Sequence, residues 1–217
     1  MTRWSMVIDI AKCIGCDACT VACKVENMSP GKIFYAPVHQ KEVGKYPSPK
    51  RVFIPLLCMH CEDAPCMKAC PSKAIYRRDD GIVLVDEKKC CGARACVSAC
   101  PYGAMHFFDG DDRTIYDTET VFDIMASQKH KYSAAQKCTF CVHRIDYGLS
   151  HGLKPGVDRD ATPACVITCP AECRIFGDLD DSGSPSSKYL EKARKEDRII
   201  FTLRPDADTG PSVIYVK

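Results

Sequence analysis

The sequence predicts a mixed α+β fold in which two small modules are built from short hairpins, short helices and long loops. The chain has 217 residues, which is enough for one large domain or two small ones. Sixteen of its 17 cysteines fall into four groups along the chain. Apolar runs of strand length separate these groups. None approaches the ~20 residues that cross a bilayer, so we expect no membrane span.

Composition narrows the class of protein. Lys and Arg number 30 against 28 Asp and Glu, which leaves a formal charge of +2. This near-neutral charge, without a stripe of aromatic and basic residues, argues against nucleic-acid binding. An odd number of cysteines excludes complete internal disulfide pairing, and the chain is far longer than the small secreted scaffolds that depend on disulfides. The cysteines therefore predict bound metal.

The spacing of the cysteines predicts iron–sulfur clusters. A tight C-x2-C-x2-C loop directs three thiolates at one cluster, and the cysteine after the next three residues ligates a neighbouring cluster. The four groups are Cys13, Cys16, Cys19 and Cys23; Cys58, Cys61, Cys66 and Cys70; Cys90, Cys91, Cys96 and Cys100; and the split group Cys138, Cys141, Cys165 and Cys169. Structural zinc sites use separated cysteine pairs, a pattern that only the split group fits. A zinc-stabilised structural or redox-sensing protein is the alternative from another class.

The segments between the groups predict the secondary structure. Strands are expected over residues 4–10, 53–57, 199–203 and 213–216. Two hairpins are expected, 74–78 with 82–86 across an Asp-Gly turn, and 104–108 with 114–116. Short helices are expected in each three-residue cysteine spacer and after Pro163, with a longer helix over 187–195. Residues 24–57 and 142–164 are expected to be inserted loops.

The grouping also predicts the domain organisation. The second and third groups are joined by a hairpin, as in a two-cluster ferredoxin, and define an inner ferredoxin-like module over residues 58–116. The first and fourth groups then pair in an outer module over 1–57 plus 117–180, and residues 181–217 add a C-terminal helix and strands.

This pairing assigns ligands to three 4Fe–4S clusters and a fourth cluster. Each group lends one cysteine to its partner's cluster. The predicted sets are Cys13, Cys16, Cys19 and Cys169 for cluster one; Cys138, Cys141, Cys165 and Cys23 for cluster two; Cys58, Cys61, Cys66 and Cys100 for cluster three; and Cys90, Cys96 and Cys70, with Cys91 as the tentative fourth ligand, for cluster four.

The third group is irregular because Ala93 stands where a regular motif has cysteine. Three ligands without Cys91 suit a 3Fe–4S cluster. Alternatively, Cys91 completes a 4Fe–4S cluster next to Cys90, although adjacent side chains tend to diverge. Both interpretations stay open. The unassigned Cys173 is expected to be a buried thiol beside a cluster.

Other polar residues near the cysteines have weaker interpretations. Basic residues near the motifs include Arg77, Arg78, Lys88, Lys89 and Arg144. They either raise cluster potentials by offsetting negative charge or form solvated surface. His60 and His143 are expected to be hydrogen-bonding or surface groups rather than ligands.

At these residues the chain resembles the iron–sulfur subunits of molybdopterin oxidoreductase complexes of the dimethyl sulfoxide reductase type. The matching stretches are 6–19, 58–66, 96–104, 138–144 with 163–170, and 211–215. Within that family it is similar to the small subunits of arsenate, polysulfide and tetrathionate reductases and of pyrogallol–phloroglucinol transhydroxylase. Ala93 departs from their pattern. Relatives of the nitrate reductase type also lack cysteine there and hold a 3Fe–4S cluster.

The resemblance implies an electron-transfer subunit with no catalytic residues of its own. It implies a large catalytic partner with a molybdenum or tungsten pterin, and a quinone-reactive membrane anchor or a cytochrome as second partner. The expected location is cytoplasmic, or periplasmic by co-export with a partner, and peripheral to the membrane. A ferredoxin-like relay of a hydrogenase or carbon monoxide dehydrogenase is the alternative from the same class.

Overall fold

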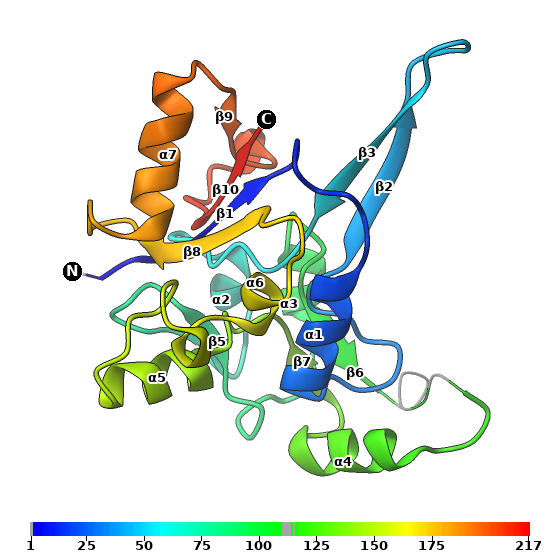
Figure 1. The fold of residues 1–217 in the computed structure, drawn as a ribbon. Coiled ribbons are helices and arrows are strands. Elements are labelled where there is room, and N and C mark those ends of the chain that lie inside the picture. Colours follow the sequence, from blue (N-terminus) through cyan, green and yellow to red (C-terminus); the bar gives the residue numbers. More distant parts are fainter. Residues whose placement is uncertain (1, 110–113, 115) are drawn as a thin grey trace.

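A computed structural model describes residues 2–109, 114 and 116–217. Its main sheet has the strand order β8-β1-β10-β9, from Arg174–Asp178, Trp4–Asp9, Val213–Val216 and Ile200–Phe201. β1 runs antiparallel to β8 and parallel to β10. The first and last strands of the chain, β1 and β10, thus lie side by side in one sheet (Figure 1). The strands predicted at 4–10, 199–203 and 213–216 are confirmed, although β9 has only two residues.

The two faces of this sheet pack against different parts of the chain. α7 (Pro185–Lys195) begins at an N-cap, Ser184, whose hydroxyl accepts from the Ser187 N–H, and it confirms the predicted helix. Its Leu190 and Ala193 pack with Val7 and Val216. Because side chains alternate along a strand, neighbours such as Met6, Ile8 and Phe176 face the other way, into the core beside the cysteines.

Four short helices carry cysteines. They are α1 (Ala18–Asn27), α2 (Pro65–Lys68), α3 (Ala95–Ala99) and α6 (Ala164–Ile167). α1 and α3 cover a predicted three-residue spacer, and α2 and α6 each cover two of its residues. α1 packs against α6, and α2 packs against α3. The first and fourth groups therefore meet at one helix pair, and the second and third groups meet at the other.

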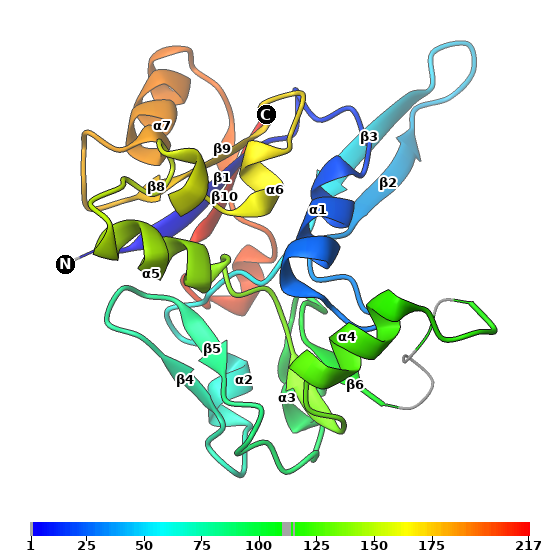
Figure 2. The same ribbon diagram turned by 60° about the horizontal axis from the view of Figure 1, so that its bottom comes forward.

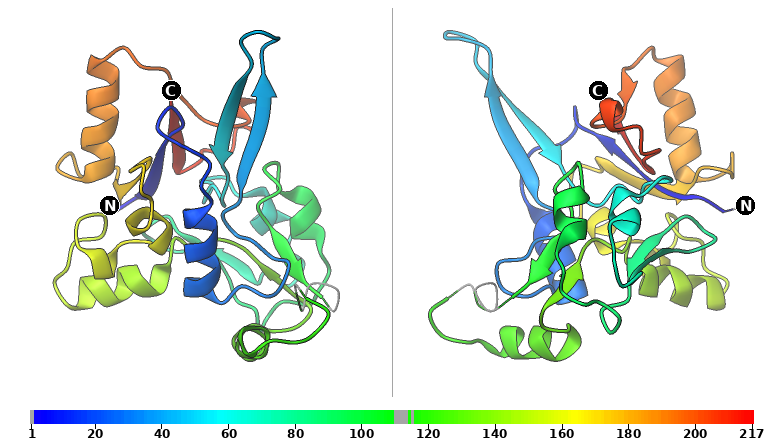
Figure 3. Two further views of the ribbon diagram at one scale, coloured as in Figure 1. Left: turned by 45° about the vertical axis from the view of Figure 1, so that its right-hand side comes forward. Right: turned by 180° about the vertical axis from the view of Figure 1, so that it is seen from behind.

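Two antiparallel hairpins connect these helices. β4 (Ile75–Arg77) and β5 (Val83–Val85) confirm the hairpin expected across the Asp-Gly turn. β2 (Val38–Val43) and β3 (Lys50–Pro55) form an arm that projects from the body in both views of Figure 3. β3 covers part of the strand expected at 53–57, whereas β2 lies in a segment expected to be loop.

The predicted pairing of 104–108 with 114–116 is wrong. β6 (His106–Phe108) pairs instead with β7 (Ala134–Gln136), and the described residues 114 and 116 are not in a strand. Residues 110–113 and 115, including most of the predicted turn, lie outside the described residues. A segment that contains α4 (Val121–Lys129) lies between β6 and β7 in the sequence. α4 lies at the opposite end of the body from α7 (Figure 2).

The segment 142–164 is not simply a loop. α5 (Val142–Ser150) and the 3-10 turn η2 (Arg159–Ala161) occupy much of it. They pack so closely that a Cβ on Gly148 would lie 2.2 Å from the Ala161 Cβ. A glycine without a side chain permits this approach, which apolar periodicity does not reveal.

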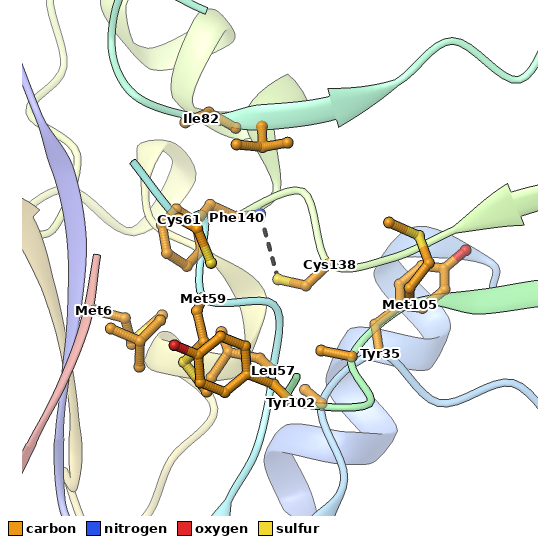
Figure 4. Packing of buried hydrophobic residues seen from close by; sticks show 14 of the residues in the cluster. Met6, Tyr35, Leu57, Met59, Cys61, Ile82, Tyr102, Met105, Cys138 and Phe140 are labelled. Carbon is orange, nitrogen blue, oxygen red and sulfur yellow. Dashed lines mark hydrogen bonds between the residues drawn. The ribbon is translucent and has the colours of Figure 1, made fainter. Parts of the chain in front are cut away.

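Cysteines form part of the main core. Seven buried cysteines belong to it: Cys19, Cys23, Cys61, Cys66, Cys96, Cys138 and Cys165. Figure 4 shows Cys61 and Cys138 among Leu57, Met59 and Phe140. Bound metal at these thiols would therefore complete the interior as well as carry function.

Candidate metal centres

The cysteines predicted for cluster one line a single cavity. Cys13, Cys16, Cys19 and Cys169 face it together with Cys173. The loop turns because Gly15 has φ +68° and Asp17, just before α1, has φ +56°. A Cβ on Gly15 would lie 2.2 Å from the Phe53 ring, so this position requires glycine.

The cysteines predicted for cluster two form the most buried set. Cys23, Cys138, Cys141 and Cys165 are all buried. Burial raises the pKa of Cys23 well above its ordinary value, and the neighbouring thiols of Cys138, Cys165 and Cys141 raise it further. Burial likewise raises the pKa of Cys141 to about 12. Thiols that resist ionisation side by side fit a site where a cationic metal core offsets their charge.

The cysteines predicted for cluster three line a second cavity. Cys58, Cys61, Cys66 and Cys100 face it, with Lys137 among the lining residues. Burial raises the pKa of Cys61 to about 11 and that of Cys66 to about 12.

The cysteines predicted for cluster four lie nearer the surface. Cys96 is buried and interacts electrostatically with Cys70 and Cys90. Cys91 is exposed. The Ala93 backbone N–H, followed by the Ser72 hydroxyl, holds the pKa of Cys91 below its usual value. The structure therefore brings Cys70, Cys90 and Cys96 together, and it places the exposed Cys91 near Cys70, which shares the Ser72 hydroxyl with it.

The third loop has the backbone of the first. Gly92 has φ +78°, and Arg94 just before α3 has φ +57°, as Gly15 and Asp17 have before α1. Aligned on Cys13 and Cys90, Ala93 takes the position of Cys16 and Cys91 takes the position of Ile14. The Ile14 side chain is 60% exposed.

The donor sets fit iron–sulfur clusters. All 17 thiols are free. A single zinc ion needs sulfurs within about 4 Å of one another, given Zn–S bonds near 2.3 Å. No group of three or more His, Cys, Asp or Glu side chains in the described part of the chain meets the requirement of one ion. The thiols of clusters one and three instead surround a cavity, as a cage of several irons requires.

Backbone N–H groups point at the predicted ligand sulfurs. Such hydrogen bonds stabilise the negative charge of a cluster and tune its potential. The N–H···S contacts, 3.3–3.5 Å long, are Ala74 to Cys70, Ala104 to Cys100, Ala135 to Cys90, Phe140 to Cys138, His60 to Cys58 and Cys173 to Cys169.

Two buried cations were not among the predicted residues. Arg174, at the start of β8, is 2% exposed, and Lys137, before Cys138, is 3% exposed. The Lys137 ammonium donates to the carbonyls of Val83 and Cys138. For Arg174, the sequence signal would have been a charged residue at an inward-facing position of a strand. That signal was missed because strand β8 was not predicted.

Three of the five predicted basic residues, Arg78, Lys89 and Arg144, have carboxylate partners. Arg78 pairs with Asp146 at 2.7 Å, and Arg144 pairs with Glu26 at 3.2 Å. Their positive charge is thus offset within the protein.

The histidines near the cysteines act as hydrogen-bonding groups. The His60 ring stacks on Phe140 with centroids 3.8 Å apart, and its Nδ1 accepts from the Val83 N–H. Burial, assisted by Lys137, holds the pKa of His60 well below its ordinary value. His143 pairs with Glu26.

The fold and the thiol sets together define a multi-cluster electron carrier. Residues 12–74 and 49–117 each match the family described as 4Fe-4S dicluster domain. In the part of the chain that is described, no helix is both long and apolar enough to cross a membrane.

Curated relatives identify the family. The chain is 34% identical to the iron–sulfur subunit of arsenate respiratory reductase from Shewanella sp. (strain ANA-3), over 99% of this chain and 96% of that protein. It is 36% identical to a selenate reductase subunit from Mesobacillus selenatarsenatis, over 99% and 72%. It is 37% identical to a tetrathionate reductase subunit from Salmonella typhimurium, also over 99% and 72%.

The chain belongs to the iron–sulfur subunits of dimethyl sulfoxide reductase-type molybdopterin oxidoreductases. Members of this family are electron-transfer subunits, and the 4Fe–4S domains support an electron relay in this chain.

Proposed function

We propose that the chain holds four clusters in the ligand sets given above, within the predicted outer and inner modules. The observation that carries the proposal is that eight of these cysteines, four from each of two predicted sets, line two cavities. When bound, the clusters supply one-electron transfer. The chain's own residues fix the sulfur positions, exclude water and direct N–H groups at the ligands.

The four sites form a row. Cys19 of cluster one interacts electrostatically with Cys165 of cluster two, and Cys58 of cluster three interacts with Cys138 of cluster two. The segment that contains α2 connects Cys66 of cluster three to Cys70 of cluster four. The segment that contains α3 connects Cys96 of cluster four to Cys100 of cluster three. The order one, two, three, four follows.

Exposure marks the ends of the row. Cys16 of cluster one and Cys91 beside cluster four are exposed, whereas every ligand of cluster two is buried. Electrons therefore enter and leave at clusters one and four, where partner proteins can approach.

Cluster four is of the 3Fe–4S type. The third loop repeats the backbone of the first, with Ala93 in the ligand position of Cys16. Cys91 occupies the position of Ile14, whose side chain is largely exposed. Cys70, Cys90 and Cys96 then supply three ligands, which is the number that a cluster lacking one corner takes.

Catalysis resides in a partner with a molybdenum or tungsten pterin, and a quinone-reactive membrane protein or a cytochrome is the second redox partner. The relatives are named as subunits of reductases for arsenate, selenate and tetrathionate. The assembly is peripheral to the membrane, either on the cytoplasmic side or exported with a signal-bearing partner.

Anaerobic co-expression of the chain with the proposed large pterin-containing subunit tests this proposal. We expect the pair to co-purify, with about 15 irons in this chain from three 4Fe–4S clusters and one 3Fe–4S cluster. EPR of the oxidised protein should show the three-iron signal, and reduction should remove it. Purification of a stable, fully loaded free monomer, or of a zinc protein without iron, contradicts the proposal.

A further inference from the structure

Arg174 is a buried arginine in the wall between two cysteine groups. It opens strand β8, where its Cα pairs with Ile8 of β1. Its register is that of Phe176, so its side chain enters the core on the cysteine side of the sheet rather than the α7 side. The residue is 2% exposed.

The groups that interact most strongly with the Arg174 charge are cysteine thiols. Its Nη1 lies 3.9 Å from Cys165 Sγ. Burial alone would lower the pKa of Arg174. The next strongest influences on this pKa are Cys165, Cys19 and Cys173, and all three raise it. Nε and Nη2 have no hydrogen-bond partner among the residues that the structure describes.

An arginine in this setting requires a negative neighbour. The guanidinium stays protonated in proteins, and a buried charge without a counter-charge is strongly unfavourable. Cys19 belongs to the cluster-one set, and Cys165 belongs to the cluster-two set. A cluster with its thiolates carries a charge of about −2, so the two sites together would supply the missing partner.

We propose that Arg174 is the shared counter-charge of clusters one and two, and that it raises the reduction potentials of both. This inference rests on the proposed ligand sets. Reduction adds one electron to a cluster, and the guanidinium keeps its protons, so the nearby positive charge stabilises the reduced state by electrostatics alone. Because it lies near ligands of both sites, its charge raises both potentials in the same direction.

The test compares Arg174→Met, Arg174→Lys and Arg144→Gln in the full chain, co-expressed with its large subunit. Met removes the charge, and Lys retains it. Arg144 is the matched control, because its charge near the same cysteine group is already paired with Glu26. EPR-monitored redox titration gives the potential of each cluster, and the Cys16→Ser and Cys141→Ser proteins identify the signals of clusters one and two.

We expect Arg174→Met to lower the reduced-to-oxidised ratio of clusters one and two about tenfold at a fixed potential, or about 59 mV for a one-electron couple. Clusters three and four should not shift, and Arg174→Lys and Arg144→Gln should stay near wild type. If Arg174→Met fails to retain iron, full loading and wild-type potentials in Arg174→Lys support the proposal.

Unchanged potentials in a fully loaded Arg174→Met protein overturn the proposal, as does an equal shift of all four clusters or loss of iron from both Arg174 variants. Failure of the proposed function is distinguishable, because it appears in the wild-type protein as a different number or ligation of clusters.

Discussion

At the residue scale, the proposed type of cluster four depends on a single alanine. Ala93 occupies the position that Cys16 holds in the first loop, on a backbone with the same two positive φ angles. We expect Ala93→Cys to convert a 3Fe–4S cluster into a 4Fe–4S cluster, because the new thiol meets the vacant corner.

The measurement for Ala93→Cys is iron content, with the oxidised three-iron EPR signal as the spectroscopic marker. Iron should rise by about one per chain and the signal should vanish. Cys91→Ser is the control and should leave both unchanged. Loss of cluster four in Cys91→Ser would show that Cys91 is a ligand.

An ion pair between the buried Asp9 and the partly exposed Arg198 links β1 to the C-terminal segment. Asp9 accepts from Arg198 Nη2 at 2.7 Å and from the Tyr189 hydroxyl. Burial raises the pKa of Asp9, but the bonds from Arg198 and Tyr189 outweigh it and hold the pKa below its usual value. A carboxyl with a depressed folded pKa contributes stability above its unfolded pKa of about 3.9, and that contribution is lost as pH falls through the folded value.

Asp9→Asn should therefore lower the unfolding midpoint at neutral pH. The difference between wild type and variant should be flat above about pH 5 and should shrink below about pH 4. Denaturant unfolding followed by circular dichroism at several pH values measures it, and cluster loss in acid affects both proteins alike. A difference that grows in acid would mean that the ion pair is not the source.

Residue-level prediction from sequence reached the grouping of the cysteines, while their ligation of clusters stays a prediction. Cysteine spacing predicted the sets that line both cavities. It could not reveal Arg174 or Lys137, since their role depends on burial created by strands and loops far away in the chain. The basic residues singled out from the sequence, such as Arg78 and Arg144, are instead paired with carboxylates. Adjacency to a cysteine was no guide either, because Lys137 precedes Cys138 and Arg174 follows Cys173 directly.

At the element scale, the close contact of α5 with η2 gives a prediction whose sign is diagnostic. Alanine in place of glycine in a helix normally stabilises by about 0.5–1 kcal/mol. At Gly148 the new Cβ would lie 2.2 Å from the Ala161 Cβ and 3.0 Å from its Cα. Overpacking of this kind costs about 1–3 kcal/mol, so Gly148→Ala should be destabilising.

Thermal unfolding of the loaded protein checks this prediction. Ser150→Ala is the control, because Ser150 lies on the same helix and is exposed. A higher unfolding midpoint for Gly148→Ala than for wild type would show that helix propensity prevails and that the segment can move apart.

Element prediction failed where pairing is non-local. The sequence offered 114–116 as the nearest partner of β6, but β7 lies beyond α4. Local sequence patterns favour pairing with the nearest strand. They do not indicate the stability of pairing between strands that are far apart in the chain. The hairpin β4–β5, closed by an Asp-Gly turn, was predictable because its partners are adjacent.

At the scale of the whole molecule, the proposed cluster sites and the hydrophobic core share residues. Seven buried cysteines belong to the main core, and burial raises the pKa of several of them, Cys66 to about 12 among others. The second core, around Val7, Leu190, Ala193 and Val216, is small. Removal of iron should therefore unfold most of the chain rather than leave an empty scaffold, because metal binding supplies part of the folding free energy.

Chelation of iron under anaerobic, reducing conditions tests this coupling. Far-UV circular dichroism should fall, and amide hydrogen exchange should become fast in α1, α2, α3 and α6, whereas reconstitution with iron and sulfide should restore both. Cys173→Ala is the control, because Cys173 lies outside the proposed ligand sets and its loss should leave iron content unchanged. An iron-free chain that keeps the cooperative unfolding midpoint of the loaded protein would show that apolar side chains alone stabilise the fold. Metal binding at the cysteines would then not contribute to the folding free energy.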